Sequence, residues 1–259
     1  MVQNKKTNAR PIVLSIAGFD PSAGAGILSD IKTMEEIGVY GMGIVSSITY
    51  QTDNKFLGVH WLSAKEIIHQ LKPILKQYTI KFIKIGLIKD LETLNIVLKY
   101  IKKYDKSIFV IVDPILRASA GFKVHNNINN SLLKKCLKKT DMLIPNWNEV
   151  CKLSQNKDAI KAAEKFAKKT IVFLKGGHSI ETPATDILFY NGKIEILHPE
   201  VITELEKHGT GCVISSAIVA NLALGYELLE ACTLAKSYTL KFLTSNQSNL
   251  GYHHTKQND

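Results

Sequence analysis

Short apolar runs alternate with segments of helical periodicity along most of this chain, and this alternation constrains the fold more than any other feature. Residues 11–17 form a continuous apolar run that ends at Gly18, which is typical of a strand buried on both faces of a sheet. A helix is expected next over Gly26–Ile37, with Gly38 ending it. Strand, glycine loop and helix make the first βα unit of a parallel sheet.

The same alternation continues along the rest of the chain. Further strands are expected over residues 43–50, 80–85, 107–112, 141–144, 170–174, 186–190 and 193–197, and further helices over residues 64–76, 91–104, 131–138, 158–168, 213–224 and 227–243. Asn191-Gly192 is a strong hairpin signal, whereas residues 116–130 have the composition of a loop. The sequence predicts an α/β fold of about eight mostly parallel strands and about eight helices. We expect one domain over residues 11–254, with tails at 1–10 and 255–259.

Composition excludes several other classes of protein. Hydrophobic residues make up 45% and charged residues 22% of the 259 positions, which is ordinary for a globular protein. The net charge of +10 comes almost entirely from lysine, because Arg10 and Arg117 are the only arginines. Since recognition of base edges relies on arginine, we interpret the excess charge as a solvated surface and expect no nucleic-acid partner.

The cysteines and the polar N-terminus indicate a cytoplasmic protein. Cys136, Cys151, Cys212 and Cys232 form neither a CxxC motif nor metal-ligand spacing with histidine, as expected of reduced thiols. Residues 1–10 do not resemble a signal peptide, and no apolar run approaches the ~18 residues that span a bilayer. We therefore expect no membrane partner.

A glycine turn with the sequence His-Gly-Thr-Gly-Cys occupies residues 208–212, directly before the helix expected over residues 213–224. Glycines allow a ligand to approach the backbone, and a helix N-terminus offers unpaired N–H groups to an anion. At the same helix start, the dipole would lower the pKa of the Cys212 thiol and favour the thiolate. An ordinary capped turn with a core cysteine is the alternative interpretation.

Polar residues gather where the predicted strands end. They are Asp20, Gln51, Asp113, Asn146 with Glu149, Lys175, and the turn that contains Cys212. Because ligands of open α/β sheets bind outside the carboxyl ends of the strands, we expect these residues to line one crevice.

Several motifs in fixed order identify a family. They are AGFDPSAGAG at residues 17–26, Lys84-Ile85-Gly86, Val112-Asp113-Pro114, Asn146-x-x-Glu149, Lys175-Gly176-Gly177-His178 and the turn at residues 208–212. With them the chain resembles, from about Ile12 to His254, the hydroxymethylpyrimidine/phosphomethylpyrimidine kinases of thiamin biosynthesis, which are members of the ribokinase-like family. The resemblance implies a three-layer αβα fold with a central, mostly parallel sheet, and a homodimer.

The resemblance also implies a reaction. Members of the family transfer the γ-phosphoryl group of ATP, with Mg²⁺, to 4-amino-5-hydroxymethyl-2-methylpyrimidine and then to its monophosphate, giving the pyrophosphate. Catalysis of such a transfer rests chiefly on positioning and charge stabilisation.

The resemblance assigns roles in phosphoryl transfer. Gly209, Thr210 and Gly211 would form an anion hole, and Cys212, where most ribokinase relatives carry aspartate, would accept the hydroxyl proton. Lys175 would neutralise the ATP phosphates, with an ordinary salt-bridging lysine as the alternative. Asp113 would assist near the phosphates or simply end its strand.

The remaining assignments concern the metal and the pyrimidine. Asn146 and Glu149 would act on Mg²⁺ or its water shell, and the alternative is a helix cap that needs no metal. Gln51 would read the pyrimidine with its amide, which offers a donor and an acceptor together, or it is a solvated turn residue. Asp20 and Gly24 would help to enclose the substrate, unless Asp20 only shapes the turn.

The chain departs from the family in one loop. Ser119-Ala120-Gly121 stands where the family often has Lys-Ser-Gly, so a phosphate-contacting lysine is absent or is replaced by Arg117 or Lys123. This departure leaves open how well the monophosphate is used.

Three rival functions remain at the level of sequence. The first is a pyridoxal kinase of the same family, against which Gln51 and Cys212 favour the pyrimidine. The second is a Rossmann oxidoreductase, suggested by Gly24-x-Gly26 but weakened by Ser29 at the third glycine position. The third is a relative that binds ligands without catalysis, against which Cys212, Lys175 and Glu149 argue.

Overall fold

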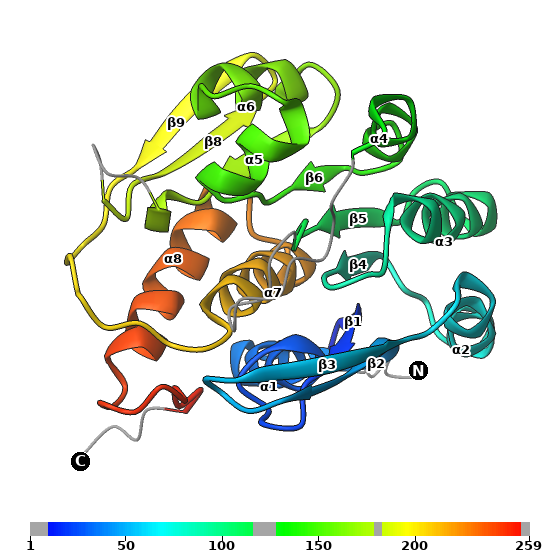
Figure 1. The fold of residues 1–259 in the computed structure, drawn as a ribbon, viewed down its shortest axis with the longest axis horizontal. Helices are drawn as coiled ribbons and strands as arrows, with labels where there is room; N and C mark the ends of the chain where they lie inside the picture. The colour runs from blue at the N-terminus through cyan, green and yellow to red at the C-terminus, as the bar shows by residue number, and fades with distance from the viewer. Residues whose placement is uncertain (1–9, 116–127, 179–182, 255–259) are drawn as a thin grey trace, which may run out of the picture.

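The central sheet has nine strands within the residues that the computed structural model describes, which are 10–115, 128–178 and 183–254 (Figure 1). Its order is β3-β2-β1-β4-β5-β6-β7-β8-β9. The strands are β1 (Ile12–Phe19), β2 (Tyr40–Gln51), β3 (Phe56–Trp61), β4 (Phe82–Ile85), β5 (Phe109–Val112), β6 (Met142–Leu143), β7 (Ile171–Leu174), β8 (Asp186–Tyr190) and β9 (Lys193–Leu197). The six central strands, β2-β1-β4-β5-β6-β7 in sheet order, are parallel to one another. At the edges, β3 pairs antiparallel with β2, β8 pairs antiparallel with β7, and β9 pairs antiparallel with β8.

Helices cover both faces of the sheet. They are α1 (Gly26–Ile37), α2 (Ala64–Gln77), α3 (Leu91–Tyr104), α4 (Asn130–Leu137), α5 (Trp147–Ser154), α6 (Ala159–Ala167), α7 (Thr210–Leu224) and α8 (Leu228–Thr244). Helices α1, α7 and α8 bury Met34, Ile218 and Cys232 on one face. Helices α2 to α6 bury residues such as Leu98 and Phe166 on the other. The expected three-layer αβα fold is confirmed, and no helix in the described ranges is long and apolar enough to cross a bilayer.

Two elements are missing from the sequence-based prediction. The edge strand β3 is not predicted, because its side chains are only partly buried and Gly58 interrupts its apolar pattern. The short helix α5 begins at Trp147, where no helix is expected from the sequence and only a helix cap at Asn146 and Glu149 is left open as an alternative. Residues 1–9 of the tail expected at 1–10, the whole tail expected at 255–259, and residues 116–127 of the loop expected at 116–130 lie outside the described residues.

Helix α7 occupies the centre of its layer. It begins at Thr210, three residues before the expected start at 213, and all residues from Cys212 to Asn221 are buried. Small side chains such as Ser216 and Ala220 allow it to pack closely between α1 and α8, above β1 and β4. The position of its N-terminus is therefore fixed from several sides.

Candidate active site

One cavity of about 1020 Å³ lies along the carboxyl edge of the parallel strands. The residues predicted from the sequence that line it are Asp20, Gln51, Asp113, Asn146, Glu149, Lys175, Gly209, Thr210, Gly211 and Cys212. The expected single crevice is confirmed for these ten. Gly24 is not among the lining residues; it packs against the side chains of His208 and Leu250.

The cavity wall is not formed by strand ends alone. Asp20, Asp113 and Lys175 directly follow β1, β5 and β7, and Gln51 ends β2. The expectation that the Cys212 turn also follows a strand end is wrong, because β9 ends at Leu197. This turn reaches the cavity instead as the start of α7.

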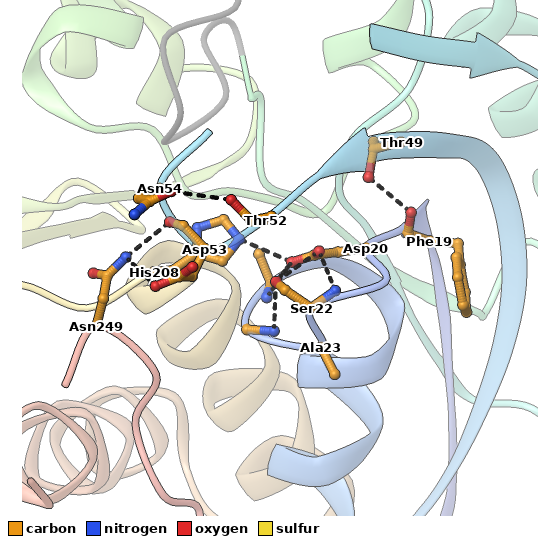
Figure 2. A network of polar contacts seen from close by, with 12 residues as sticks. Phe19, Asp20, Ser22, Ala23, Thr49, Thr52, Asp53, Asn54, His208 and Asn249 are labelled. Atoms are coloured by element: carbon orange, nitrogen blue, oxygen red, sulfur yellow. Dashed lines mark hydrogen bonds and ion pairs between the residues drawn. The ribbon is translucent and has the colours of Figure 1, made fainter. Parts of the chain in front are cut away.

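The loop after β1 is organised around the carboxylate of Asp20, which is 1% exposed (Figure 2). It accepts hydrogen bonds from Ser22 N at 2.9 Å, Ser22 Oγ at 2.8 Å and Ala25 N at 2.9 Å. His208 Nε2 lies 2.8 Å from Asp20 Oδ2. Burial alone would raise the pKa of Asp20, but the hydrogen bonds from His208, Ser22 and Ala25 outweigh it and lower the pKa to about 2. Asp20 is therefore an ionised residue that holds its own loop.

The glycine turn and the Asp20 loop touch backbone to backbone. Gly209 is the N-cap of α7 and has φ +83°. A Cβ on Gly209 would collide with the carbonyl group of Gly24. Val213 N donates the first helical hydrogen bond, to Gly209 O at 3.0 Å, so the amides of Thr210, Gly211 and Cys212 have no acceptors within the helix. Thr210 N donates instead to Lys207 O at 3.4 Å. Amides without intrahelical acceptors at a helix N-terminus are groups to which an anion can bind.

We expect Gly209→Ala to destabilise the protein by about 2 kcal/mol or more, because alanine is strained at positive φ and its Cβ would collide with the main-chain carbonyl group of Gly24. Chemical denaturation measures the change. Gly225→Ala is the matched control, since Gly225 ends the same helix at φ +97° and a Cβ there would have nothing within 4 Å. Equal destabilisation by the two variants would contradict the close approach of Gly209 to Gly24.

The Cys212 thiol lies in surroundings that oppose ionisation. Cys212 is 6% exposed. Burial raises the pKa of its thiol to about 11, although the nearby Lys84 ammonium group acts to lower this pKa. The expectation that the helix start lowers the pKa of Cys212 is therefore wrong, because desolvation of the thiol outweighs the effects that favour the thiolate. At neutral pH the group is a thiol.

A buried ion pair lies close enough to Cys212 to affect its ionisation. Lys84 Nζ donates to Asp30 Oδ1 at 2.5 Å, and both side chains are 0% exposed. Ser15 and Ser216 donate further hydrogen bonds to Asp30, at 2.5 and 2.8 Å. The sequence contains the Lys-Ile-Gly motif but indicates no role for its lysine, because the partner lies 54 residues away.

Lys175 joins two carboxylates at the cavity wall. Its ammonium group donates to Asp113 Oδ1 at 2.7 Å and lies 3.8 Å from Glu149 Oε2. Burial would lower the pKa of Lys175, but Asp113 and Glu149 raise it to about 12, so the cation persists at neutral pH. Asp113 also accepts a hydrogen bond from Ser215 Oγ of α7 at 3.0 Å. The cluster thus ties β5, β7 and α7 together.

Asn146 and Glu149 form a capping box at the start of α5. Asn146 N donates to Glu149 Oε2 at 2.7 Å, and Glu149 N donates to Asn146 Oδ1 at 2.9 Å. The helix cap that the sequence leaves open as an alternative is thus present. In the described ranges no group of three or more His, Cys, Asp or Glu side chains is arranged to hold a metal ion. The oxygen donors fit Mg²⁺ that keeps most of its waters and is shared with phosphates.

Comparison with known proteins agrees with this arrangement. The family model described as phosphomethylpyrimidine kinase matches residues 20–258. A hydroxymethylpyrimidine/phosphomethylpyrimidine kinase of Aquifex aeolicus is 32% identical over 251 residues, covering 93% of this chain and 96% of the relative.

Solved structures show the same fold. A phosphomethylpyrimidine kinase from Clostridium difficile matches with a TM-score of 0.75 and 30% identity, covering 90% of this chain and 99% of that one. A pyridoxal kinase from Staphylococcus aureus in complex with AMP-PCP and pyridoxal matches with a TM-score of 0.80 and 26% identity, covering 94% and 92%. The fold is thus ribokinase-like, as the sequence predicted. The chain is a phosphotransferase and belongs to the phosphomethylpyrimidine kinase family.

Proposed function

We propose that this protein phosphorylates 4-amino-5-hydroxymethyl-2-methylpyrimidine, and then its monophosphate, with ATP, in thiamin biosynthesis. The observation that carries the proposal is the single cavity in which Gln51 lies together with the glycine turn and Lys175. The names of the relatives support the substrate, and the complex of the pyridoxal kinase with AMP-PCP supports the nucleotide.

In the first proposed step, the substrate hydroxyl oxygen attacks the γ-phosphorus of ATP and ADP leaves. In the second step, an oxygen of the monophosphate's phosphate group attacks instead, and ADP again leaves. The amides of Gly209, Thr210 and Gly211 stabilise charge on the transferred group, and Lys175 does so on the nucleotide phosphates. Cys212 accepts the hydroxyl proton on Sγ in its thiolate form, which becomes the neutral thiol. The thiolate is the minor form at neutral pH because burial raises the pKa of the thiol. Gln51 orients the pyrimidine through its amide, and Asp20 keeps the neighbouring loop in place.

Mg²⁺, when bound, would neutralise phosphate charge. Asn146 and Glu149 are the residues proposed to hold it, through its water shell, at the end of the cavity where Lys175 and Asp113 lie. The homodimer implied by the family resemblance stays a prediction, as does the cytoplasmic location.

Product identification by mass tests the substrate. The protein is offered ATP with the hydroxymethylpyrimidine, with its monophosphate and with pyridoxal, in separate reactions. We expect mass gains of one phosphoryl group on the first two compounds. Turnover of pyridoxal alone would identify a pyridoxal kinase and contradict the proposal.

Replacing Cys212 with alanine is expected to lower kcat/KM by about 100-fold, which is the lower range for loss of a general base. Because the pKa of the free thiol is raised to about 11, kcat/KM of the unchanged protein should rise as the pH increases from 7 towards 10. The increase of kcat/KM with pH should be absent in Cys212→Ala. It should be smaller in Cys212→Asp, because the carboxylate of that variant is already ionised at about pH 7. Steady-state pH profiles measure this.

Cys232→Ala is the matched control for Cys212→Ala, since Cys232 is another buried free cysteine and does not line the cavity. It should keep the pH profile of the unchanged protein. Near-full turnover by Cys212→Ala would leave the glycine turn as an anion site but would assign the proton to another group.

A further inference from the structure

His208 is the first residue of the glycine turn, and the proposed reaction gives it no role. Its side chain is 2% exposed, and it lies at 2.8 Å from Asp20, a residue 188 positions earlier in the chain (Figure 2). Because Asp20 is ionised, its carboxylate accepts the hydrogen bond and His208 Nε2 donates it. The imidazole therefore links the start of the glycine turn to the loop after β1.

The second ring nitrogen of His208 is unusual. Nδ1 is buried and has no hydrogen-bond partner among the described residues. Since a buried polar atom without a partner disfavours folding, a site that only required packing would be better filled by an apolar side chain. Polar residues that break this rule are most often found at functional sites.

The backbone of His208 provides a second link. Its N–H donates to Asn249 O at 2.9 Å, in the segment that follows α8. The side chain of Asn249 in turn donates to Asp53 O at 2.8 Å, and Asp53 lies two residues after Gln51 (Figure 2). Residues 246–249 therefore connect the glycine turn to the end of β2.

The residue before His208 is held by the same segment. Lys207 is buried, and its Nζ donates to Asn246 O at 2.8 Å and to Ser248 O at 2.6 Å. Two consecutive residues at the entry to the glycine turn are thus fixed by residues 246–249. The His208 ring packs so closely on the Gly24 backbone that a Cβ at position 24 would collide with it.

We propose that His208 is a positioning residue: through Asp20 on one side and Asn249 on the other, it holds the glycine turn at a fixed distance from the loops proposed to bind the pyrimidine. This inference rests on the proposed role of the glycine turn in binding the transferred phosphoryl group. Displacement of that group by about 1 Å can lower a rate about 100-fold. A fault in positioning should therefore affect the γ-phosphoryl group more than the rest of the nucleotide.

The experiment compares ADP with AMP-PCP, which adds a group at the γ position. Titration calorimetry measures the affinities for ADP and for AMP-PCP at the same magnesium concentration. It is carried out on the wild-type protein and on the variants His208→Leu and His208→Gln. We expect His208→Leu to weaken AMP-PCP about tenfold while ADP binding changes little, and to lower kcat by about 10- to 100-fold. His208→Gln should recover much of both, because its amide nitrogen can still donate to Asp20.

Asn221→Leu is the matched control. Like His208→Leu it removes a buried polar side chain, but Asn221 lies on α7 and outside the cavity lining. It should alter Tm alone. Equal weakening of ADP and AMP-PCP by His208→Leu, or a fall in Tm with no change in either affinity, would overturn the proposal.

A second variant covers the case in which His208→Leu does not fold. Asn249→Ala leaves the imidazole in place and removes the hydrogen bond to Asp53, and we expect the same selective loss of AMP-PCP affinity. Unchanged selectivity in Asn249→Ala would refute the proposed link. Failure of the unchanged protein to phosphorylate the hydroxymethylpyrimidine would refute the proposed substrate instead, and the comparison of ADP with AMP-PCP would still test the positioning role.

Discussion

Replacing Lys84 with methionine is expected to lower the free energy of unfolding by about 3–5 kcal/mol, the range for removing one partner of a buried ion pair. The reason is the Asp30 carboxylate, which is 0% exposed and whose remaining side-chain donors, within the part of the chain that the structure describes, would be the hydroxyl groups of Ser15 and Ser216. Denaturant unfolding followed by circular dichroism measures the change.

Two further variants sharpen this measurement. The double variant Asp30→Asn, Lys84→Met removes both charges and should regain a large part of the lost stability. Lys161→Met is the control, because the Lys161–Asp158 pair is exposed and worth less than about 1 kcal/mol. A loss below about 1 kcal/mol in Lys84→Met would show that water reaches Asp30 in solution.

Replacing Lys175 with methionine is expected to lower kcat/KM by about 100- to 1000-fold, comparable to the loss of a donor that stabilises charge in a transition state. The variant removes the cation proposed to face the nucleotide phosphates, and it leaves Asp113 and Glu149 close together without it. Both effects disfavour binding of an anionic substrate. Steady-state kinetics with ATP varied at saturating second substrate measures the loss.

Lys102→Met is the matched control for Lys175→Met. Lys102 is also a largely buried lysine, paired with Asp141 at 2.6 Å, but Asp141 precedes β6 and lies at the opposite edge of the sheet from the cavity. We expect it to reduce Tm without lowering kcat/KM. If Lys175→Met kept activity within about threefold of the unchanged protein, charge neutralisation by Lys175 would be excluded as a large contribution.

The parts of the fold that could be predicted are those with a strong local pattern. The buried runs that form β1, β5 and β7, and the periodic helix α3, are readable because one period dominates each segment. Strand β3 carries no such pattern, since an edge strand is only half covered and needs no apolar run.

The candidate site divides in the same way. That polar residues at strand ends would meet in one cavity follows from the geometry of parallel sheets, and the lining of the cavity confirms it. Desolvation of Cys212 could not be predicted, because it depends on which elements cover the thiol. The contact between Asp20 and His208 was equally hidden, since it joins residues 188 positions apart.

Helix α7 has a consequence for how this protein tolerates change. Its 15 residues include no charged side chain, and ten consecutive positions are buried. Nearly every substitution in α7 therefore changes the packing of the core. Because the core is closely packed, the resulting shift of the helix also moves the glycine turn at its N-terminus. The lysines that give the chain its net charge of +10 must lie elsewhere. Substitutions of surface lysines can therefore change the net charge, and with it the association rate of anionic ligands, without changing the geometry of the glycine turn.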